Sequence, residues 1–253
     1  MKAVILSAGQ GKRLLPLTER VPKALVEVAP ETTILDWQLG QLAAAGVDDV
    51  TVVTGFAADQ VEAALAAAPA GMRTTTRYNP FCAVADNLSS VWLALDALGE
   101  DAVVLNGDTL FAAPVAERLL AAAAPASVVI SRKDGYDGDD MKVQLAGGRL
   151  AAVGKGLDAA SVDAESIGMM RFRGAGMARF REAVRAAMRR EDALRVWYLS
   201  VVDTLAREGG VAVCEAGPEE WCEVDFPADL TQAREALARW RAGTDAGRAA
   251  TAS

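Results

Sequence analysis

The sequence predicts an α/β fold with a mostly parallel, Rossmann-like sheet that carries helices on both faces. Three observations support this prediction. Short apolar runs of strand type at residues 3–6, 49–55 and 102–106 alternate with segments of helical periodicity. The runs end at small or polar residues, such as Ser7 and Gly107. Strands that alternate with helices pair in parallel through right-handed crossovers, so their carboxyl ends meet at one edge of the sheet, where ligands bind.

The elements of the first half follow from local patterns. They are, in order, a strand at 3–6, a helix at 33–45, a strand at 49–55, a short helix at 59–68, a strand at 72–78, a helix at 87–98 and a strand at 102–106. The first and last strands are continuous apolar runs, as expected of strands buried on both faces. The helix at 33–45 starts at Thr33, carries an apolar stripe and stops at Gly46. Asn79 and Pro80 close the strand at 72–78.

The second half of the sequence is predicted to extend this sheet with parallel and antiparallel strands. Its elements are a strand at 127–131, strands at 141–145 and 149–153, a strand at 166–172, helices at 175–189 and 196–207, strands at 211–215 and 221–224, and a helix at 227–241. The small residues at 146–148 join the second and third strands as a hairpin. Pro227 suits the first position of the last helix. Residues 242–253 lack apolar periodicity and are expected to form a flexible tail, which leaves 1–241 as a single domain.

The composition limits the cellular compartment and the binding partners that can be expected of this protein. The 253-residue chain is 52% hydrophobic, and no apolar run reaches the ~18 residues that a membrane span requires. Its start lacks the layout of a signal peptide, and its three cysteines lack metal-ligand spacing, so a cytoplasmic protein is expected. The net charge of −8 argues against a nucleic-acid surface, and we expect neither nucleic-acid nor membrane partners. The absence of histidine excludes Ser–His and Cys–His catalysis.

The segment after the first strand is predicted to bind an anion. Residues 7–13 read Ser-Ala-Gly-Gln-Gly-Lys-Arg. Small residues, including Gly9 and Gly11, let backbone N–H groups approach a ligand closely, and Lys12 and Arg13 add two positive charges. The segment is not a P-loop, and it lacks the third glycine of a dinucleotide-binding loop. A plain glycine-rich turn is the alternative, whereas the composition favours a polyphosphate ligand.

The full string from Leu6 to Leu25 is more specific than its glycines. It reads Leu-Ser-Ala-Gly-Gln-Gly-Lys-Arg-Leu-Leu-Pro-Leu-Thr and continues to Pro22 and Lys23. This string resembles the signature of the nucleotidyltransferase superfamily, which includes sugar-1-phosphate nucleotidylyltransferases and phosphocholine cytidylyltransferases. The resemblance implies a Rossmann-like α/β fold of the nucleotide-diphospho-sugar transferase type.

The resemblance also implies the residues of the reaction centre. Asp108 ends the string Leu-Asn-Gly-Asp, and Asp225 lies in Trp-Cys-Glu-Val-Asp-Phe-Pro. In the family, an Asp at each of these positions coordinates Mg²⁺, a hard cation that prefers carboxylate oxygens; a turn or a helix cap is the alternative for each. Arg13 and Lys23 are implied to bind the nucleotide phosphates. The other residues expected at the nucleotide are Ser7, Ala8, Gly9, Gln10, Gly11, Lys12, Thr54, Asn79, Asn87 and Gly107.

A second group of residues is expected to hold the acceptor. The group consists of Lys142, Lys155, Tyr136, Glu165 and Trp197. The resemblance favours the two lysines for the acceptor phosphate. Aromatic rings suit a quaternary ammonium through cation–π attraction, whereas an acid such as Glu165 or Asp140 suits a primary amine. The alternatives are exposed lysines on strands, packed aromatic rings and a surface acid.

The resemblance implies transfer of a nucleotidyl group. Residues 86–90, Asp-Asn-Leu-Ser-Ser, suit a helix N-cap. They also resemble a stretch of the phosphocholine-type cytidylyltransferases, with Asp86 where that pattern has Asn. The Gly/Thr-rich turn of many sugar nucleotidyltransferases is absent. We therefore predict a cytidylyltransferase that moves CMP from CTP to phosphocholine, 2-aminoethylphosphonate or a related phosphonate, with Mg²⁺ as cofactor and release of pyrophosphate.

The missing histidine agrees with this chemistry. A phosphate or phosphonate acceptor is already largely anionic at pH 7, so it attacks without a general base. A sugar-1-phosphate nucleotidylyltransferase and a non-catalytic nucleotide-binding regulator are the alternatives. A monomer and a homodimer are both compatible with the sequence.

Overall fold

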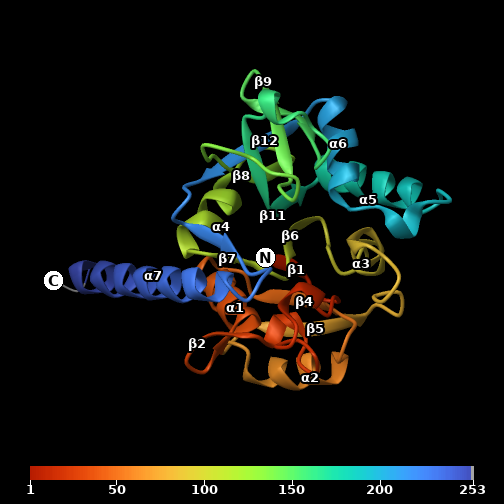
Figure 1. The fold of residues 1–253 in the computed structure, drawn as a ribbon. Coiled ribbons are helices and arrows are strands. Elements are labelled where there is room, and N and C mark those ends of the chain that lie inside the picture. Colours follow the sequence, from red (N-terminus) through yellow and green to blue (C-terminus); the bar gives the residue numbers. More distant parts are fainter. Residues whose placement is uncertain (252–253) are drawn as a thin grey trace.

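One mixed sheet runs through the molecule, for which the computed structural model describes the backbone of residues 1–251 and the side chains of residues 1–243. Within these residues, nine strands pair in the order β5, β4, β1, β6, β11, β8, β12, β10, β9 (Figure 1). The first four are parallel: β1 (Lys2–Leu6) lies between β4 (Asp49–Thr54) and β6 (Asp101–Asn106), and β5 (Arg73–Tyr78) forms the edge. The carboxyl ends of these strands therefore meet at one edge of the sheet.

The other half of the sheet is mostly antiparallel. β11 (Ala164–Arg173) pairs antiparallel with β6 and with β8 (Ala126–Ser131), and β12 (Val211–Ala216) lies parallel to β8. β9 (Lys142–Ala146) and β10 (Arg149–Val153) form the predicted hairpin. Because β10 pairs with β12 and β9 pairs with the start of β11, the strand pairs of this half close into a ring. The predicted α/β class with a mixed sheet is confirmed.

Two apolar cores cover the two faces of the sheet. The helices are α1 (Ile34–Ala44), α2 (Ala58–Ala64), α3 (Asn87–Leu93), α4 (Ala113–Ala121), α5 (Ala175–Ala187), α6 (Leu199–Arg207) and α7 (Asp229–Thr251). Successive residues of β1 point to opposite faces. Ala3 and Ile5 therefore pack with α1, α2 and α4, whereas Val4 packs with α3, α5 and α6.

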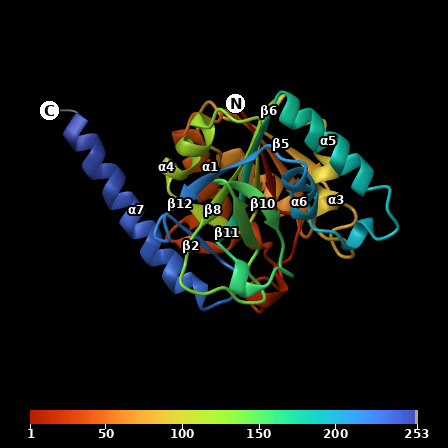
Figure 2. The same ribbon diagram turned by 90° about the horizontal axis from the view of Figure 1, so that it is seen from above.

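A small third core lies beside the strand ends. β7 (Thr109–Phe111) pairs antiparallel with β13 (Trp221–Glu223), and β2 (Glu27–Ala29) pairs with β3 (Thr32–Thr33). Residues of these short strands pack against the first turns of α7 through Leu230. The C-terminal part of α7 extends away from the body of the molecule (Figures 1 and 2). This third core holds the end of β13 next to the end of β6.

Several predicted boundaries differ from the structure. Short 3₁₀ helices are present at Lys12–Leu14, Lys23–Leu25, Leu65–Ala67, Ala159–Ser161 and Ala193–Arg195. The helix expected at 87–98 ends at Leu93 and continues as turns, although Leu95 and Leu98 still pack into the core. The last helix does not end at Arg241 but continues to Thr251, so the segment expected to be a tail is helical that far. Among the described helices, none combines the length and the apolar character that crossing a membrane would require.

Candidate active site

The loop after β1 folds back on itself and packs against Lys23. Gly11 has a positive φ of 75°, and a Cβ atom at this position would lie 2.9 Å from the Cβ atom of Lys23. The Thr18 hydroxyl donates to the Gly11 carbonyl at 2.7 Å, and the Gln10 amide donates to the Thr18 carbonyl at 3.2 Å. Glycine is therefore required at position 11 both by the backbone conformation and by the approach of Lys23.

Lys23 joins the two carboxylates that the sequence singled out. Its Nζ donates to Asp108 Oδ2 at 2.8 Å and to Asp225 Oδ1 at 2.6 Å. Asp108 follows β6 and Asp225 follows β13, so the third core brings them together from distant parts of the sequence. Burial alone would lower the pKa of Lys23, but attraction to the two carboxylates outweighs it and raises this pKa. Lys23 is therefore a charged residue at the centre of the cluster.

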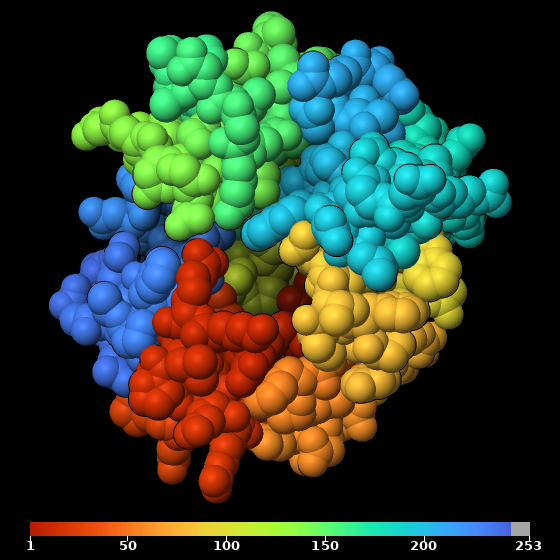
Figure 3. All heavy atoms as spheres, turned by 45° about the vertical axis from the view of Figure 1, so that its right-hand side comes forward, coloured from red at the N-terminus to blue at the C-terminus, as the bar shows by residue number. Residues whose placement is uncertain are grey.

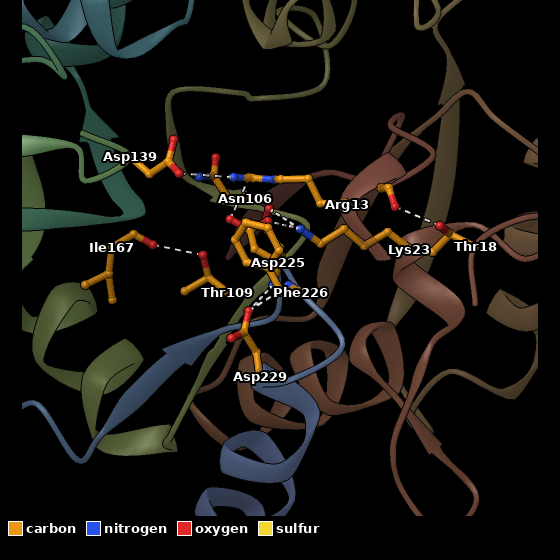
Figure 4. Close-up of polar contacts among 12 residues, drawn as sticks. Arg13, Thr18, Lys23, Asn106, Thr109, Asp139, Ile167, Asp225, Phe226 and Asp229 are labelled. Carbon is orange, nitrogen blue, oxygen red and sulfur yellow. Dashed lines mark hydrogen bonds and ion pairs between the residues drawn. The ribbon is translucent and has the colours of Figure 1, made fainter. Parts of the chain in front are cut away.

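Arg13 binds the other carboxylate oxygen of Asp225. Its guanidinium donates to Asp225 Oδ2 at 2.7 Å and lies 5.1 Å from the centre of the Phe226 ring (Figure 4). A carboxylate oxygen of Asp139 lies 3.8 Å from the guanidinium. Asp229, at the start of α7, accepts the backbone N–H groups of Asp225 and Phe226 at 2.8 and 2.7 Å. These contacts hold the segment 225–226 in place. Neither Asp139 nor Asp229 was among the predicted site residues.

A further acid, Glu223, adjoins the cluster. Burial and the nearby charges of Asp108 and Asp225 raise the pKa of Glu223. Glu223 was not among the predicted site residues. The signal was present, because residues two apart on an extended segment point to the same side, and Glu223 precedes Asp225 by two positions.

Asp108 and Asp225 are the residues that fit a divalent cation. The Oδ1 atom of Asp108 is buried and has no hydrogen-bond partner in the described part of the chain, so it is free for a cationic ligand. The described residues contain no group of three or more His, Cys, Asp or Glu side chains arranged for a metal ion. Mg²⁺ commonly binds one or two carboxylates and retains several waters, so a pair of aspartates suits it better than it suits Zn²⁺.

A pocket of about 240 Å³ opens at the ends of β1 and β6. It is lined by Leu6, Ala8, Gly9, Asn79, Cys82, Ala85, Asp86, Asn87, Ser90, Asn106, Gly107, Asp108 and Trp197. A Cβ atom at Gly107 would lie 2.5 Å from the Leu6 carbonyl oxygen, so glycine lets the two strand ends approach. Figure 3 shows the surface hollowed between the red N-terminal segment, the yellow segment and the green and cyan segments. We call this cavity the first pocket.

The first pocket contains half of the residues predicted for the nucleotide. Ala8, Gly9, Asn79, Asn87 and Gly107 line it. The other five, Ser7, Gln10, Gly11, Lys12 and Thr54, do not line it. Ser7 and Thr54 are buried, and Lys12 is exposed. The loop around Gln10 and Gly11 continues from the first pocket toward Lys23.

Asn79 organises the loop that borders the first pocket. Its Nδ2 donates to the hydroxyls of Ser89 and Ser90 at 3.1 and 2.9 Å, and its Oδ1 accepts the N–H of Phe81 at 2.9 Å. Its own N–H donates to the Thr54 carbonyl. The amide is thus fully used within the protein, so Asn79 positions the pocket wall.

A second, narrower pocket of about 100 Å³ adjoins the first. It is lined by Arg13, Asn106, Asp108, Asp139, Asp140, Met141, Lys155, Glu165, Ser166, Trp197, Leu199, Glu223 and Asp225. Asn106, Asp108 and Trp197 line both pockets. The two pockets therefore meet at Asp108, and acids predominate in the second pocket.

Glu165 is the buried acid of the second pocket. Lys133 Nζ lies 3.1 Å from Glu165 Oε2 and donates to Asp140 Oδ1 at 2.7 Å. Burial raises the pKa of Glu165 to about 7; Lys133 opposes this rise, and the neighbouring Asp140 adds to it. The carboxyl of Glu165 is therefore poised between its neutral and charged forms near neutral pH.

Lys155 and Trp197 lie together at the mouth of the second pocket. Lys155 Nζ lies 4.5 Å from the centre of the Trp197 ring and 3.6 Å from a carboxylate oxygen of Asp139. Both residues line the second pocket, and their contact with an acceptor stays a prediction. One side of the ring already interacts with a cation in this structure.

The two remaining predicted acceptor residues are not lining residues of either pocket. Lys142 is buried, and its Nζ donates to the Lys155 carbonyl at 2.8 Å, so it positions Lys155 instead of facing an acceptor. Tyr136 accepts a hydrogen bond from the Lys133 N–H at 3.3 Å, and its ring centre lies 5.7 Å from Lys133 Nζ. Lys142 therefore contacts a lining residue of the second pocket, whereas Tyr136 contacts Lys133, which lines neither pocket.

Comparison with known proteins relates the chain to enzymes of nucleotide transfer. The family model described as nucleotidyl transferase matches residues 2–134. The CMP-5'-(3-aminopropyl)phosphonate synthase of Streptomyces rubellomurinus is 39% identical over 132 residues, which are 52% of this chain and 21% of that protein. The chain thus spans about a fifth of the length of that relative. The 2-aminoethylphosphonate cytidylyltransferase of Lancefieldella rimae is 25% identical over 230 residues, 90% of this chain and 89% of that protein.

A solved structure supports the fold. The inositol-1-phosphate CTP transferase from T. maritima superposes with a TM-score of 0.79 at 21% sequence identity, over 95% of this chain and 96% of that chain. At this identity the likeness concerns the fold alone.

Proposed function

The chain belongs to the nucleotidyl transferase family, and we propose that it transfers CMP from CTP to the phosphate or phosphonate of a small acceptor that carries an amine. Pyrophosphate is the second product. This proposal agrees in substrate class with the named activities of the two relatives compared above.

One observation carries the proposal. Two pockets meet at Asp108, Lys23 binds the Asp108 carboxylate, and Arg13 lines the second pocket. The first pocket has the small-residue walls and strand-end position of a nucleotide site. The second pocket is smaller and charged, as an acceptor site should be. A binding module for a single nucleotide has no need of the second pocket.

The chemistry requires alignment and charge neutralisation. An oxygen of the acceptor phosphate or phosphonate attacks the α-phosphorus of CTP, and the bond from that phosphorus to the bridging oxygen of pyrophosphate breaks. No proton has to be removed from the attacking oxygen, because it is already ionised near pH 7. Arg13 and Lys23 would stabilise the negative charge that develops on pyrophosphate. Mg²⁺, held by Asp108 and Asp225, would supply further charge neutralisation at the phosphates.

The second pocket supports an acceptor with a cationic end. Lys155 offers a positive charge to the acceptor phosphate, whereas Asp139, Asp140 and Glu165 line the same pocket with acidic groups. A primary amine donates up to three hydrogen bonds, and these carboxyl groups can accept them. A sugar phosphate has no cationic group to add to the partners that these carboxyl groups already have, which are Lys133, Lys155 and Arg13.

The test is a pyrophosphate-release assay that varies both substrates. CTP, UTP, dTTP and GTP are each combined with 2-aminoethylphosphonate, 3-aminopropylphosphonate, phosphocholine, an uncharged alkylphosphonate and glucose 1-phosphate. We expect CTP with an aminoalkylphosphonate to give the highest kcat/KM. A preference for dTTP or UTP with glucose 1-phosphate would assign a sugar-1-phosphate nucleotidylyltransferase instead. Absence of turnover in every combination would favour the alternative of a non-catalytic nucleotide-binding regulator.

A further inference from the structure

Asp86 occupies a helix N-cap position without capping the helix. It precedes α3, and its side chain makes no hydrogen bond to the first turn. Thr33 shows the usual arrangement before α1, where its hydroxyl accepts the Asp36 N–H at 3.1 Å. Among the described residues, neither a hydrogen bond nor an ion pair is formed by the Asp86 carboxylate. Because Asp86 lines the first pocket, its carboxylate is available there.

Asn87 offers a donor beside this acceptor. Its Oδ1 accepts the backbone N–H of Tyr198 at 2.9 Å, which orients the amide. Within the described part of the chain, Nδ2 of Asn87 has no hydrogen bond. Asn87 also lines the first pocket. The wall of this pocket therefore presents a negatively charged acceptor and a neutral donor on adjacent residues.

The turn that carries these groups is held in place from the opposite segment. The Asp86 N–H donates to the Leu194 carbonyl at 2.8 Å, and the Leu88 N–H donates to the Val196 carbonyl at 3.4 Å. With the Asn87–Tyr198 bond, three hydrogen bonds tie residues 86–88 to 194–198. A wall fixed in this way can discriminate between ligands, because little binding energy is lost in ordering it.

We propose that Asp86 selects cytosine by accepting a hydrogen bond from its exocyclic amino group, while the Asn87 amide donates to the adjacent ring acceptors. This inference rests on the proposed function for its nucleotide, CTP. Cytosine presents an amino donor at position 4, and a carboxylate is a suitable acceptor for it. Uracil and thymine present a carbonyl oxygen at that position, which a carboxylate repels. Asp86 is thus a specificity-determining residue, and it takes no part in the chemical step.

Equilibrium binding tests this assignment without an acceptor. Isothermal titration calorimetry with CTP and with UTP, both in Mg²⁺, is carried out on the wild-type protein, Asp86→Asn and Asp86→Ser. The Asn amide can donate to the uracil carbonyl, and Ser retains the ability to cap α3. Asp96→Asn is the matched control, because Asp96 pairs with Arg77 on the surface and does not line the pocket. Circular dichroism checks the fold of each variant.

The expected result is a change in the ratio of the two affinities. The wild type should bind CTP about 10- to 100-fold tighter than UTP, the range of a charge-assisted hydrogen bond. In Asp86→Asn and Asp86→Ser the ratio should fall at least about tenfold, whereas Asp96→Asn should retain it. A wild-type preference for CTP that persists in both Asp86 variants would overturn this inference and leave the proposed function intact. A wild type without preference for CTP would overturn both.

Discussion

The raised pKa of Glu165 has a measurable consequence for the stability of the protein. The carboxyl group titrates at about 7 in the folded chain, against an ordinary value of 4.5. The folded state therefore binds more protons than the unfolded state between these two pH values, so stability falls as pH rises through that window. The pKa difference corresponds to at most about 3 kcal/mol of unfolding free energy, which is fully lost above pH 7.

The substitution Glu165→Gln removes the titrating group. The amide can still accept a hydrogen bond from Lys133, which lies 3.1 Å from the carboxylate. We expect the variant to gain stability relative to the wild type as pH rises from 5 to 8, by at most about 3 kcal/mol or roughly 6–12 °C in Tm. Thermal unfolding followed by circular dichroism at pH 5, 6, 7 and 8 measures this difference.

Glu220 offers a control with the opposite sign. Burial raises its pKa, but hydrogen bonds from Arg118 and from the Gly217 N–H outweigh that effect and lower it. A lowered pKa stabilises the folded state, and this contribution is lost only as pH falls below the ordinary value of 4.5. Glu220→Gln should therefore be less stable than the wild type by an amount that stays constant from pH 5 to 8. If the Tm curves of Glu165→Gln and the wild type ran parallel from pH 5 to 8, the reasoning about Glu165 would be refuted.

Three further substitutions test the rest of the site. Asp108→Asn should lower kcat on the order of 10²-fold while Tm is retained, because it weakens the proposed Mg²⁺ site; an unchanged rate of pyrophosphate release would contradict this role. Lys23→Met should lower the Tm in EDTA by roughly 5–15 °C, since two carboxylates lose their cation. The control Lys2→Met should have little effect in a matched calorimetric scan, because Lys2 is half-buried and its partner Asp49 retains Arg73. Trp197→Leu should raise the KM of both substrates, whereas Trp92→Leu, with the same 41% exposure outside both pockets, should change neither in steady-state kinetics.

The parallel half of the sheet could be predicted because its information is local. Apolar runs and glycines mark the ends of β1 and β6, and the position of Asp108 follows from the sheet rule alone. Asp225 required the resemblance, because its approach to Asp108 depends on the pairing of β7 with β13. Strands of three residues give no periodic signal, and no strand was predicted at Thr109–Phe111, the residues of β7.

The predicted acceptor residues were harder to place because their positions also depend on features that give no periodic signal in the sequence. The side chain of Lys142 is fixed by a hydrogen bond to a carbonyl across the hairpin, which depends on the register of β9 and β10. Tyr136 and Asp139 lie in a loop held mainly by local side-chain hydrogen bonds, such as the one from the Asp139 N–H to Asp137, and these give no periodic signal in the sequence. A side chain can be assigned to a surface from sequence only where the backbone path is already determined by periodicity.

The charge balance of the site connects its geometry with its choice of ligand. The two cations of the site already have acidic partners, because Lys23 binds Asp108 and Asp225 and Arg13 binds Asp225. In a protein of net charge −8, a triphosphate must compete with these carboxylates for the same cations. The triphosphate gains nothing from Lys23 and Arg13 unless Asp108 and Asp225 receive another positive partner. A nucleotide that arrives with a divalent cation supplies that positive charge. In the same way, an acceptor with an amine supplies positive charge to the acids of the second pocket. The charges of the site therefore favour a metal-bound nucleotide in the first pocket and a cationic acceptor in the second.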